Sequence, residues 1–154
     1  MERTGKCIDG DCRNGTGTMI TPEGIRYTGE FQNSVAHGSG AISFPGGNRY
    51  VGEFANGIPH GKGTMTLPDG SRFTGTMDNG VPAGQGIITY PDGRQQEGEF
   101  ANGMPNGPGR TTFPDGTVFN GNFVNGVPDG PGTLTMPDGT RQEGRWRNGE
   151  LVKT

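Results

Sequence analysis

Hydrophobic and polar residues alternate along short stretches of this chain, and the alternation returns every 23 residues. In the stretch that begins at Tyr50, the residues Gly52 and Phe54 share a face with Tyr50, and the residues between them point the other way. A second stretch, which includes Gly61 and Met65, alternates in the same manner. A period of two is typical of β-strands, so each 23-residue unit predicts a β-hairpin.

Aromatic residues and glycines occupy fixed positions in these units. The head position holds Tyr27, Tyr50, Phe73, Gln96, Phe119 and Gln142. The position two residues later is always glycine, at Gly29, Gly52, Gly75, Gly98, Gly121 and Gly144. The next hydrophobic position holds Phe31, Phe54, Met77, Phe100, Phe123 and Trp146. A fixed period of this size indicates a repeat array and argues against a globular enzyme fold.

Two kinds of turn sequence separate the expected strands. Pro-Asp-Gly closes the units at residues 68–70, 91–93, 114–116 and 137–139. It predicts a type I turn with a bulge, because proline presets the first turn position and glycine accepts a positive φ. The loop inside a unit spans residues 56–60, and we expect it to bury its own hydrophobic residue, Ile58. That position is repeated by Val35, Val81, Met104 and Val127.

We expect a single all-β domain over residues 1–154. Residues 1–26 form a degenerate N-terminal hairpin in which Ile8 takes the place of Phe31, residues 27–141 form five full repeats, and residues 142–154 form a partial C-terminal repeat and a tail. Helix is implausible because glycine or proline interrupts every window of the chain. Glycine inside a strand is favoured where another group approaches closely, so we expect aromatic rings to pack over the strand glycines.

Composition and charge limit the classes of function. The chain has 32 glycines, 12 prolines and only 27% hydrophobic residues, a composition that suggests disorder until the strict register of the glycines is considered. A net charge of −3 weighs against a nucleic-acid partner. No apolar run approaches the roughly 20 residues that a membrane-spanning helix requires.

Two cysteines leave the compartment open. Cys7 and Cys12 flank the turn dipeptide Asp9-Gly10. One 23-residue period later, the equivalent residues are Glu30 and Val35, which lie at the two sides of the loop in the next hairpin. That separation suits a cross-strand disulfide, which would imply an oxidising compartment and an exported envelope domain. The alternative is a pair of reduced thiols. The localisation is cytoplasmic if Met1 is the natural start, and extracytoplasmic if the chain was trimmed from an exported precursor.

The sequence predicts no catalytic, cofactor or metal site. His37 and His60 lie one repeat apart, about 10 Å in a sheet, which is too far for both to bind one metal ion. We expect them to form hydrogen bonds in their loops. The Gly-x-Gly pairs are not followed by a helix, so they do not indicate nucleotide binding. Periodicity spreads the carboxylates along the array, so we expect no enzyme.

The combination of Tyr-x-Gly-x-Phe, Asn-Gly-x-Pro-His-Gly-x-Gly and Pro-Asp-Gly resembles the MORN repeat (membrane occupation and recognition nexus) over about residues 14–149. The resemblance implies an elongated, twisted antiparallel sheet of stacked β-hairpins with a groove along one side. It also implies a non-catalytic scaffold that binds a helix or an extended segment of another protein. This chain departs from the pattern at Gln96 and Gln142, and at Ala83, Asn106 and Asp129, which replace the histidine.

The candidate groove consists of the head aromatic residues and the two histidines: Tyr27, Tyr50, Phe73, Phe119, His37 and His60. These rings are first of all core residues, but a thin curled sheet cannot cover both faces of every ring, and a tyrosine has a polar tip suited to an interface. A protein partner is expected, although its identity cannot be read from the sequence. A homodimer is a further prediction, because the terminal strands are open edges.

Two ladders of charge lie on the face opposite the aromatic residues. One contains Arg26, Arg49, Arg72 and Arg141, and the other contains Glu30, Glu53 and Glu99. The ordinary interpretation is a solvated face with cross-strand ion pairs, each worth about 1 kcal/mol at most. The alternative is an arginine stripe for acidic lipid headgroups or phosphates, and hence a peripheral membrane module. Because glutamates oppose the arginines, we expect membrane contact to be weak.

Overall fold

The computed structural model describes residues 5–152, and these residues form an all-β protein. Fourteen strands follow one another in chain order, β1 to β14, in an antiparallel sheet, and the described residues contain no helix. The prediction of an all-β array of hairpins is therefore confirmed. Residues 1–4 and 153–154, which belong to the predicted N-terminal hairpin and C-terminal tail, lie outside the described part of the chain.

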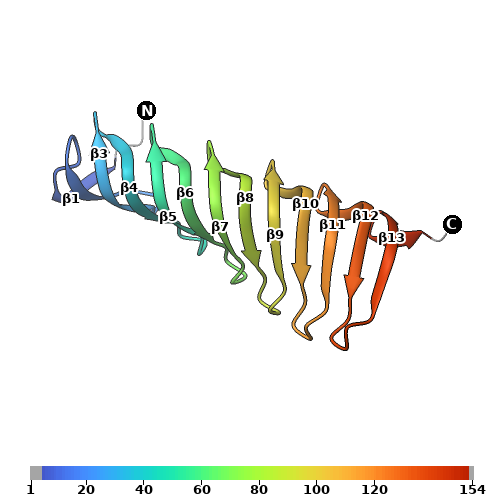
Figure 1. Ribbon diagram of the computed structural model, residues 1–154. Helices are drawn as coiled ribbons and strands as arrows, with labels where there is room; N and C mark the ends of the chain where they lie inside the picture. Colours follow the sequence, from blue (N-terminus) through green and yellow to red (C-terminus); the bar gives the residue numbers. More distant parts are fainter. Residues whose placement is uncertain (1–4, 153–154) are drawn as a thin grey trace. The chain divides into compact units, whose positions relative to one another are not determined.

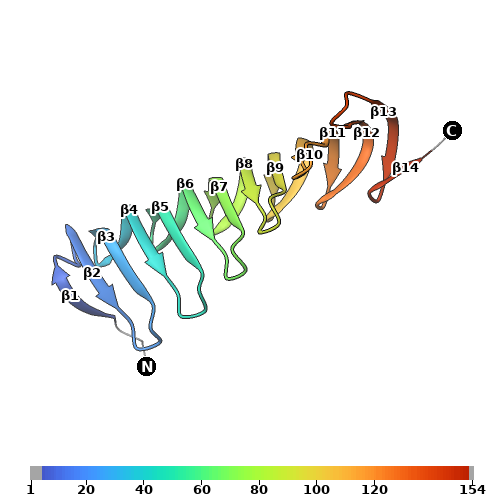
Figure 2. The ribbon, with the colours of Figure 1, turned by 90° about the horizontal axis from the view of Figure 1, so that it is seen from below.

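The strands belong to two compact units, residues 1–81 (unit 1) and residues 82–154 (unit 2). Unit 1 contains β1 (Lys6–Gly10), β2 (Thr16–Ile20), β3 (Arg26–Gln32), β4 (Val35–Ser43), β5 (Arg49–Ala55), β6 (Ile58–Thr66) and β7 (Arg72–Asp78). Strand β8 (Val81–Thr89) begins at the last residue of unit 1 and otherwise belongs to unit 2. Unit 2 also contains β9 (Gln95–Ala101), β10 (Met104–Thr112), β11 (Val118–Val124), β12 (Val127–Thr135), β13 (Arg141–Arg147) and β14 (Glu150–Val152). Within each unit the strands lie side by side in chain order (Figures 1 and 2). The single domain expected from the sequence stays a prediction.

A two-residue turn joins the strands of each full hairpin; it is Asn33-Ser34 between β3 and β4 and Asn-Gly in the others. Between β5 and β6 the turn residues Asn56 and Gly57 have φ angles of 53° and 87°. Positive φ at both positions defines a type I′ turn, whose twist matches that of the flanking strands. Strand β6 therefore begins directly after the turn, at Ile58.

The prediction that this loop buries a hydrophobic residue is wrong. Ile58 is 41% exposed, and the equivalent residues Val35, Val81, Met104 and Val127 are exposed as well. A two-residue turn leaves no loop interior to fill. The residue after the turn is already the first residue of a strand, and its side chain points to solvent.

The Pro-Asp-Gly turns match the type I turn with a bulge that the sequence predicts. The N–H of Gly70 donates to the carbonyl of Leu67 at 2.9 Å, and the φ of Gly70 is 97°. The carboxylate of Asp69 accepts the N–H of Ser71 at 2.8 Å. This hydrogen bond from Ser71 lowers the pKa of Asp69.

The aromatic rings lie over paired glycines, as expected from the sequence. Gly52 lies opposite Gly63 in the β5–β6 pair, and a Cβ atom on Gly63 would overlap the ring and hydroxyl of Tyr50. The hydroxyl of Tyr50 donates to the carbonyl of Glu53 at 3.0 Å. Glycine is required here because the ring occupies the space of a side chain.

The pairing of the strands shifts just beyond the glycine pair of a hairpin, as the β5–β6 pair illustrates. Gly52 is opposite Gly63, whereas Phe54 is opposite Pro59. The same shift occurs in the β3–β4, β9–β10 and β11–β12 pairs. Such a bulge bends the strand and increases its local twist. The bend is what lets the head ring reach over the glycines of its own hairpin.

The core is a row of rings that meet both within a repeat and between repeats. Tyr27 contacts Phe31 in its own strand and Phe54 in the next repeat, each edge-to-face with ring centroids 5.0 Å apart. In unit 2, Phe119 contacts Phe123 at 5.5 Å and Trp146 at 5.0 Å. Each repeat therefore completes the core of its neighbour, as in other repeat proteins.

The first hairpin differs from the others because it lacks this aromatic core. Ile8, expected to take the place of Phe31, is 48% exposed, and the register shifts between Cys7 and Asp9. Cys12 is buried and forms a disulfide with Cys7, with a Cα–Cα distance of 5.9 Å. Cys12 lies in the turn after β1, so the disulfide joins a strand to its own turn and does not bridge two strands.

Candidate functional site

The four aromatic residues predicted to form the floor of a groove are buried in this structure. The most exposed of them, Tyr27, is only 6% exposed, and Tyr50, Phe73 and Phe119 are less exposed than Tyr27. Their rings are the core of the array. Tyr27 and Phe119 also line surface hollows, one in each unit. A role for the four residues in partner binding stays a prediction.

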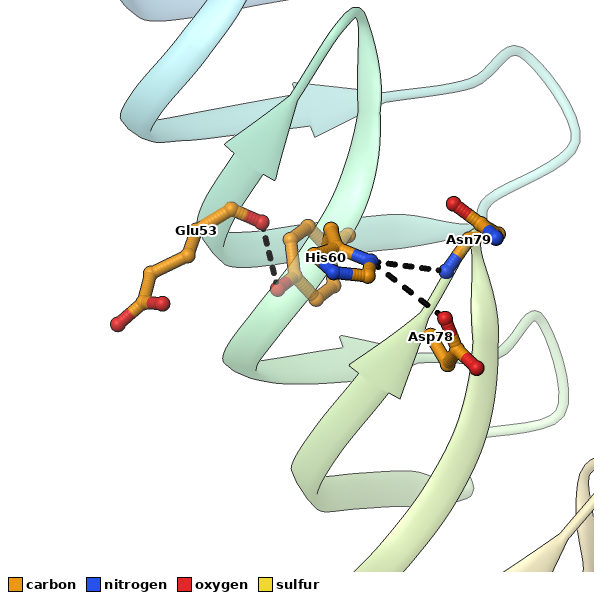
Figure 3. A network of polar contacts seen from close by, with 5 residues as sticks. Glu53, His60, Asp78 and Asn79 are labelled. Atoms are coloured by element: carbon orange, nitrogen blue, oxygen red, sulfur yellow. Dashed lines mark hydrogen bonds and ion pairs between the residues drawn. The ribbon is translucent and has the colours of Figure 1, made fainter.

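The two histidines accept hydrogen bonds from the neighbouring repeat. Nδ1 of His60 accepts the N–H of Asn79 at 3.2 Å, and Nδ1 of His37 accepts the N–H of Asn56 at 3.5 Å. Figure 3 shows the His60 ring directed at Asn79, with a carboxylate oxygen of Asp78 3.6 Å from the same nitrogen. The hydrogen-bonding role expected for the histidines is therefore the one that the structure gives them.

Asparagine is the hydrogen-bond acceptor at the equivalent position of two repeats that lack the histidine. Oδ1 of Asn14 accepts the N–H of Asn33 at 2.9 Å, and Oδ1 of Asn106 accepts the N–H of Asn125 at 3.4 Å. The following glycine of each Asn-Gly turn donates to a carbonyl of the preceding repeat; the N–H of Gly80, for example, donates to Pro59 at 2.8 Å. Where the preceding repeat supplies asparagine or histidine, it holds both amides of the turn, and this fixes the spacing between those hairpins.

A hollow of about 320 Å³ lies beside the core rings of unit 2. We call it the unit 2 hollow. It is lined by Tyr90, Arg94, Gln96, Pro105, Thr111, Phe113, Phe119, Phe123, Gly126, Pro128, Leu134, Trp146 and Gly149. Its volume lies at the lower end of the range for ligand sites, and its lining is largely aromatic and aliphatic, as such sites usually are.

The aromatic residues at the opening of this hollow were missed at the sequence level. Tyr90 and Phe113 are partly exposed, and each immediately precedes a Pro-Asp-Gly turn. The signal was present, because that position is hydrophobic in successive repeats, with Phe44 and Leu67 in unit 1. The position lies directly after the second strand of the hairpin, outside the alternating pattern of the strand itself.

Two polar groups mark the unit 2 hollow. The guanidinium of Arg94 lies over the Tyr90 ring, 4.4 Å from its centroid, and its Nε is 3.1 Å from Oδ2 of Asp92. Nε1 of Trp146 is buried, and within the described part of the chain no acceptor lies within hydrogen-bond distance of it. A buried donor without an acceptor costs about 1–3 kcal/mol.

Gln96 shows how the array accommodates a polar residue at the head position. Its side chain is 6% exposed, and Oε1 accepts a hydrogen bond from the Thr111 hydroxyl in the adjacent strand. Threonine thus satisfies the buried amide oxygen, which would otherwise be costly. The side chain of Gln96 is smaller than an aromatic ring, so part of the space that a ring would fill stays empty and contributes to the hollow.

A second hollow, of about 410 Å³, lies in unit 1 and has a more aliphatic lining. Met19, Ile25, Val35 and Ile42 contribute to it together with Tyr27. It lacks the partly exposed aromatic residues of the unit 2 hollow. The unit 2 hollow is therefore the stronger candidate for recognition of a specific ligand.

Burial changes the titration of two core tyrosines. It raises the pKa of Tyr27 to about 12, helped by the nearby charge of Glu30, and it raises the pKa of Tyr50. Both phenols donate to a backbone carbonyl, Tyr27 to that of Glu30 at 2.7 Å. They are structural hydrogen-bond donors at neutral pH.

Residues 5–152 contain no group of three or more histidine, cysteine or acidic side chains arranged for a metal ion. In the same part of the chain, no helix is long and apolar enough to cross a membrane. The described polar contacts instead serve turns and neighbouring strands.

Comparison with known proteins gives matches to one sequence family and to several solved structures. The MORN repeat matches five consecutive segments, residues 27–49, 50–72, 73–93, 97–118 and 119–141. A search of curated proteins gives no match. Among solved structures, the TCP domain of SAS-4 (dCPAP) from Drosophila melanogaster has a TM-score of 0.54 at 11% identity, covering 93% of this chain and 90% of that one.

Two further solved structures match with lower TM-scores. A mutant of the TCP10 domain of CPAP from Danio rerio gives 0.33 at 20% identity, over 85% of this chain and 72% of that one. A CPAP G-box domain gives 0.43 at 14% identity, over 94% and 100%. At these identities the similarity concerns the fold alone. The repeat register, the hairpins and the five matched segments together establish that this chain belongs to the MORN-repeat family.

Proposed function

We propose that this chain is a non-catalytic scaffold that binds an extended segment of another protein in the unit 2 hollow. The observation that carries the proposal is the cluster of partly exposed rings there, Tyr90, Phe113 and Trp146, beside an arginine stacked on one of them. Aromatic residues and arginine are the residues most enriched in protein-binding sites.

The size of the hollow favours an extended segment over a helix. A volume of about 320 Å³ accommodates a few side chains, whereas an α-helix with its side chains is about 10–12 Å across. Aromatic-lined grooves of this kind commonly accept proline-rich segments, which are already extended before binding and so lose little entropy. The occupant we propose is therefore an extended, proline-containing segment.

One structural neighbour supports this choice of occupant. The Drosophila SAS-4 domain is in complex with a proline-rich motif of Ana2 (dSTIL). That protein shares only 11% of its residues with this chain, so the neighbour supports the kind of ligand and not its identity. The periodic spread of acidic side chains along the array supports a role without catalysis.

Trp146 provides a direct test because it is the single tryptophan of the chain and lines the hollow. Its fluorescence should change in a saturable manner when a panel of synthetic proline-rich peptides is added. Alanine-substituted versions of the same peptides should give no change. Phe113→Ala should abolish the response, because it removes a ring from the wall.

Phe44→Ala is the matched control, because Phe44 occupies the same position of the repeat in unit 1 and is also exposed. It should leave the response intact. Equal loss in both variants, or saturable binding of helical but not proline-rich peptides, would contradict the proposal. A lack of binding to the whole panel at millimolar peptide would also do so.

The other sequence-level interpretations stay predictions with their own tests. A peripheral membrane module should sediment with anionic vesicles in a salt-dependent manner. A homodimer should appear in light scattering. The exported-domain interpretation requires the Cys7–Cys12 disulfide to be present in protein isolated from its host, where titration should then find no free thiol.

A further inference from the structure

A row of cationic side chains crosses the outward face of unit 1. The strand register places Lys6 opposite Ile20, and Ile20 opposite Arg26. The same row continues across β4 to β7 through Ser43, Arg49, Thr66 and Arg72. We call Lys6, Arg26, Arg49 and Arg72 the cation row; all four side chains are exposed.

Neutral residues separate the members of this row. Within residues 5–152 no carboxylate forms an ion pair with any of the four cations. Glu23 and Asp69 lie in the turns three residues before Arg26 and Arg72. Glu30 and Glu53 lie four residues after the cations of their own strands, about 13 Å away. The carboxylate of Glu30 is engaged there, where Oε2 accepts the N–H of Ser39 at 3.3 Å. The cross-strand ion pairs expected from the sequence therefore do not form along this part of the face.

Unit 2 has no equivalent of the cation row. The same register there contains Thr89, Gln95, Thr112, Val118, Thr135 and Arg141. Arg141, the last of these, lies 3.6 Å from a carboxylate oxygen of Glu143. A row of cations that form no ion pair with the described carboxylates is thus a property of unit 1 and not a by-product of the repeat.

The spacing of the row selects the conformation of a ligand. The cations occupy alternate strands, so they recur about every 9.6 Å. A polyproline II helix has three residues per turn and rises about 3.1 Å per residue, so every third side chain points the same way at steps of about 9.3 Å. An α-helix presents the same face again after seven residues, about 10.5 Å. Its mismatch with the spacing of the cations is therefore about 0.9 Å per step, about three times the mismatch of roughly 0.3 Å for a polyproline II helix.

We propose that the cation row binds an acidic, proline-rich segment of another protein, held as a polyproline II helix with a carboxylate at every third residue. The hydroxyls of Ser43 and Thr66 lie between the cations, where they can donate to the peptide carbonyls, which such a helix leaves free. A narrow chain contacts the row alone. A broad anionic membrane would also meet Glu30 and Glu53 on the same face.

Two peptides of equal composition test this proposal by fluorescence anisotropy. One consists of about four Glu-Pro-Pro triplets, and the other has the same residues with the glutamates in one block. The triplet peptide should bind more tightly, and its affinity should fall as salt is raised. Arg26→Gln, Arg49→Gln and Arg72→Gln should each weaken it about two- to fivefold.

Arg13→Gln is the matched control, because it removes the same charge from an exposed residue of unit 1 outside the row. It should leave the affinity unchanged. Phe113→Ala should also leave it unchanged, which separates this surface from the unit 2 hollow. Equal affinity of the two peptides, equal effects of Arg13→Gln and Arg49→Gln, or arginine-dependent binding to anionic vesicles but to neither peptide, would each overturn the proposal.

Discussion

At the scale of single residues, chemically different side chains perform the same task in successive repeats. The N–H of the asparagine that begins a two-residue turn donates to asparagine at Asn14 and Asn106 and to histidine at His37 and His60. The common requirement is an acceptor about 3 Å from that N–H. The histidine must present an unprotonated Nδ1, because a protonated nitrogen cannot accept.

Replacing His60 tests this role. His60→Ala removes the acceptor and should lower the free energy of unfolding by about 0.5–1 kcal/mol, since the bond is exposed to solvent. His60→Asn should retain most of the stability, because asparagine supplies the acceptor elsewhere in the array. Ala83→Asn should add stability of similar size. Urea denaturation of the three variants measures all three effects, and equal losses in the two His60 variants would argue against the hydrogen bond.

Trp146 carries a buried donor without an acceptor, so a ring that lacks the donor should be tolerated. Phenylalanine stands at this position in Phe31, Phe54, Phe100 and Phe123. Trp146→Phe should leave the free energy of unfolding unchanged or raise it by up to about 1 kcal/mol, because the uncompensated N–H disappears. Trp146→Ala should instead cost about 3 kcal/mol or more through loss of packing. A large loss in the phenylalanine variant would show that the N–H is satisfied in solution.

The core tyrosines make the stability sensitive to alkaline pH. Burial raises the pKa of Tyr27 to about 12 from 10.0, so the folded state keeps a proton that the unfolded state loses near pH 10. Stability from this difference is complete below pH 10 and is lost as pH rises towards 12. Denaturation at a series of pH values should show this decline. Tyr27→Phe, which has no phenolic proton, should flatten part of it, and an identical pH profile would contradict the assignment.

At the scale of the hairpin, the contact between a ring and a glycine pair determines what can be substituted. A Cβ on Gly63 overlaps Tyr50, which is almost completely buried and cannot move aside. At Gly109 such an atom would lie 2.9 Å from the backbone oxygen of Glu97, and in place of a ring hydroxyl it would meet the flexible amide of Gln96 at 3.2 Å. At Gly46, in a turn, the nearest atom is 3.8 Å away.

Alanine substitution should therefore rank these glycines. Gly63→Ala should cost about 1–3 kcal/mol, Gly109→Ala should cost less, and Gly46→Ala should be close to neutral. Thermal denaturation of the three variants provides the comparison. If Gly46→Ala were as harmful as Gly63→Ala, the cost would come from backbone freedom and not from the ring.

The sequence was sufficient to predict the hairpins, the return turns and the packing of rings on glycines, because each follows from a strict period. It was not sufficient at the Asn-Gly turn. Residues 56–60 were interpreted as one loop, although positive φ at Asn56 and Gly57 lets the strand resume at Ile58. The prediction that Ile8 takes the place of Phe31 in the first hairpin is wrong for a similar reason, because the register shift between Cys7 and Asp9 moves Ile8 out of the core.

The candidate sites were harder to predict, because surface position depends on the bend of each hairpin. The head rings Tyr50 and Phe73 were expected to border a groove but are buried. The partly exposed rings, Tyr90 and Phe113, come from strand ends. Lys6 joins the cation row through its pairing with Ile20, a relation that a count of 23 residues does not reveal.

At the scale of the whole molecule, the repeats offer extended surface where a globular enzyme would offer a cleft. Unit 1 contributes the cation row, and unit 2 contributes the aromatic hollow. The four cations of the row lie on alternate strands, and the hollow is lined by residues of the consecutive strands β9 to β13 and of the turns beside them. Both surfaces therefore extend over several strands and favour a ligand with an extended backbone. Such extended surfaces explain how a chain with only 27% hydrophobic residues can act as a scaffold.

The most direct test of that role is an NMR titration of isotope-labelled protein with a proline-rich peptide that changes Trp146 fluorescence. The account predicts saturable shifts in the backbone amides of Tyr90 and Phe113 and in the Trp146 indole N–H, with the amides around Phe44 unchanged. Shifts scattered over both units, or confined to residues outside the unit 2 hollow, would contradict it.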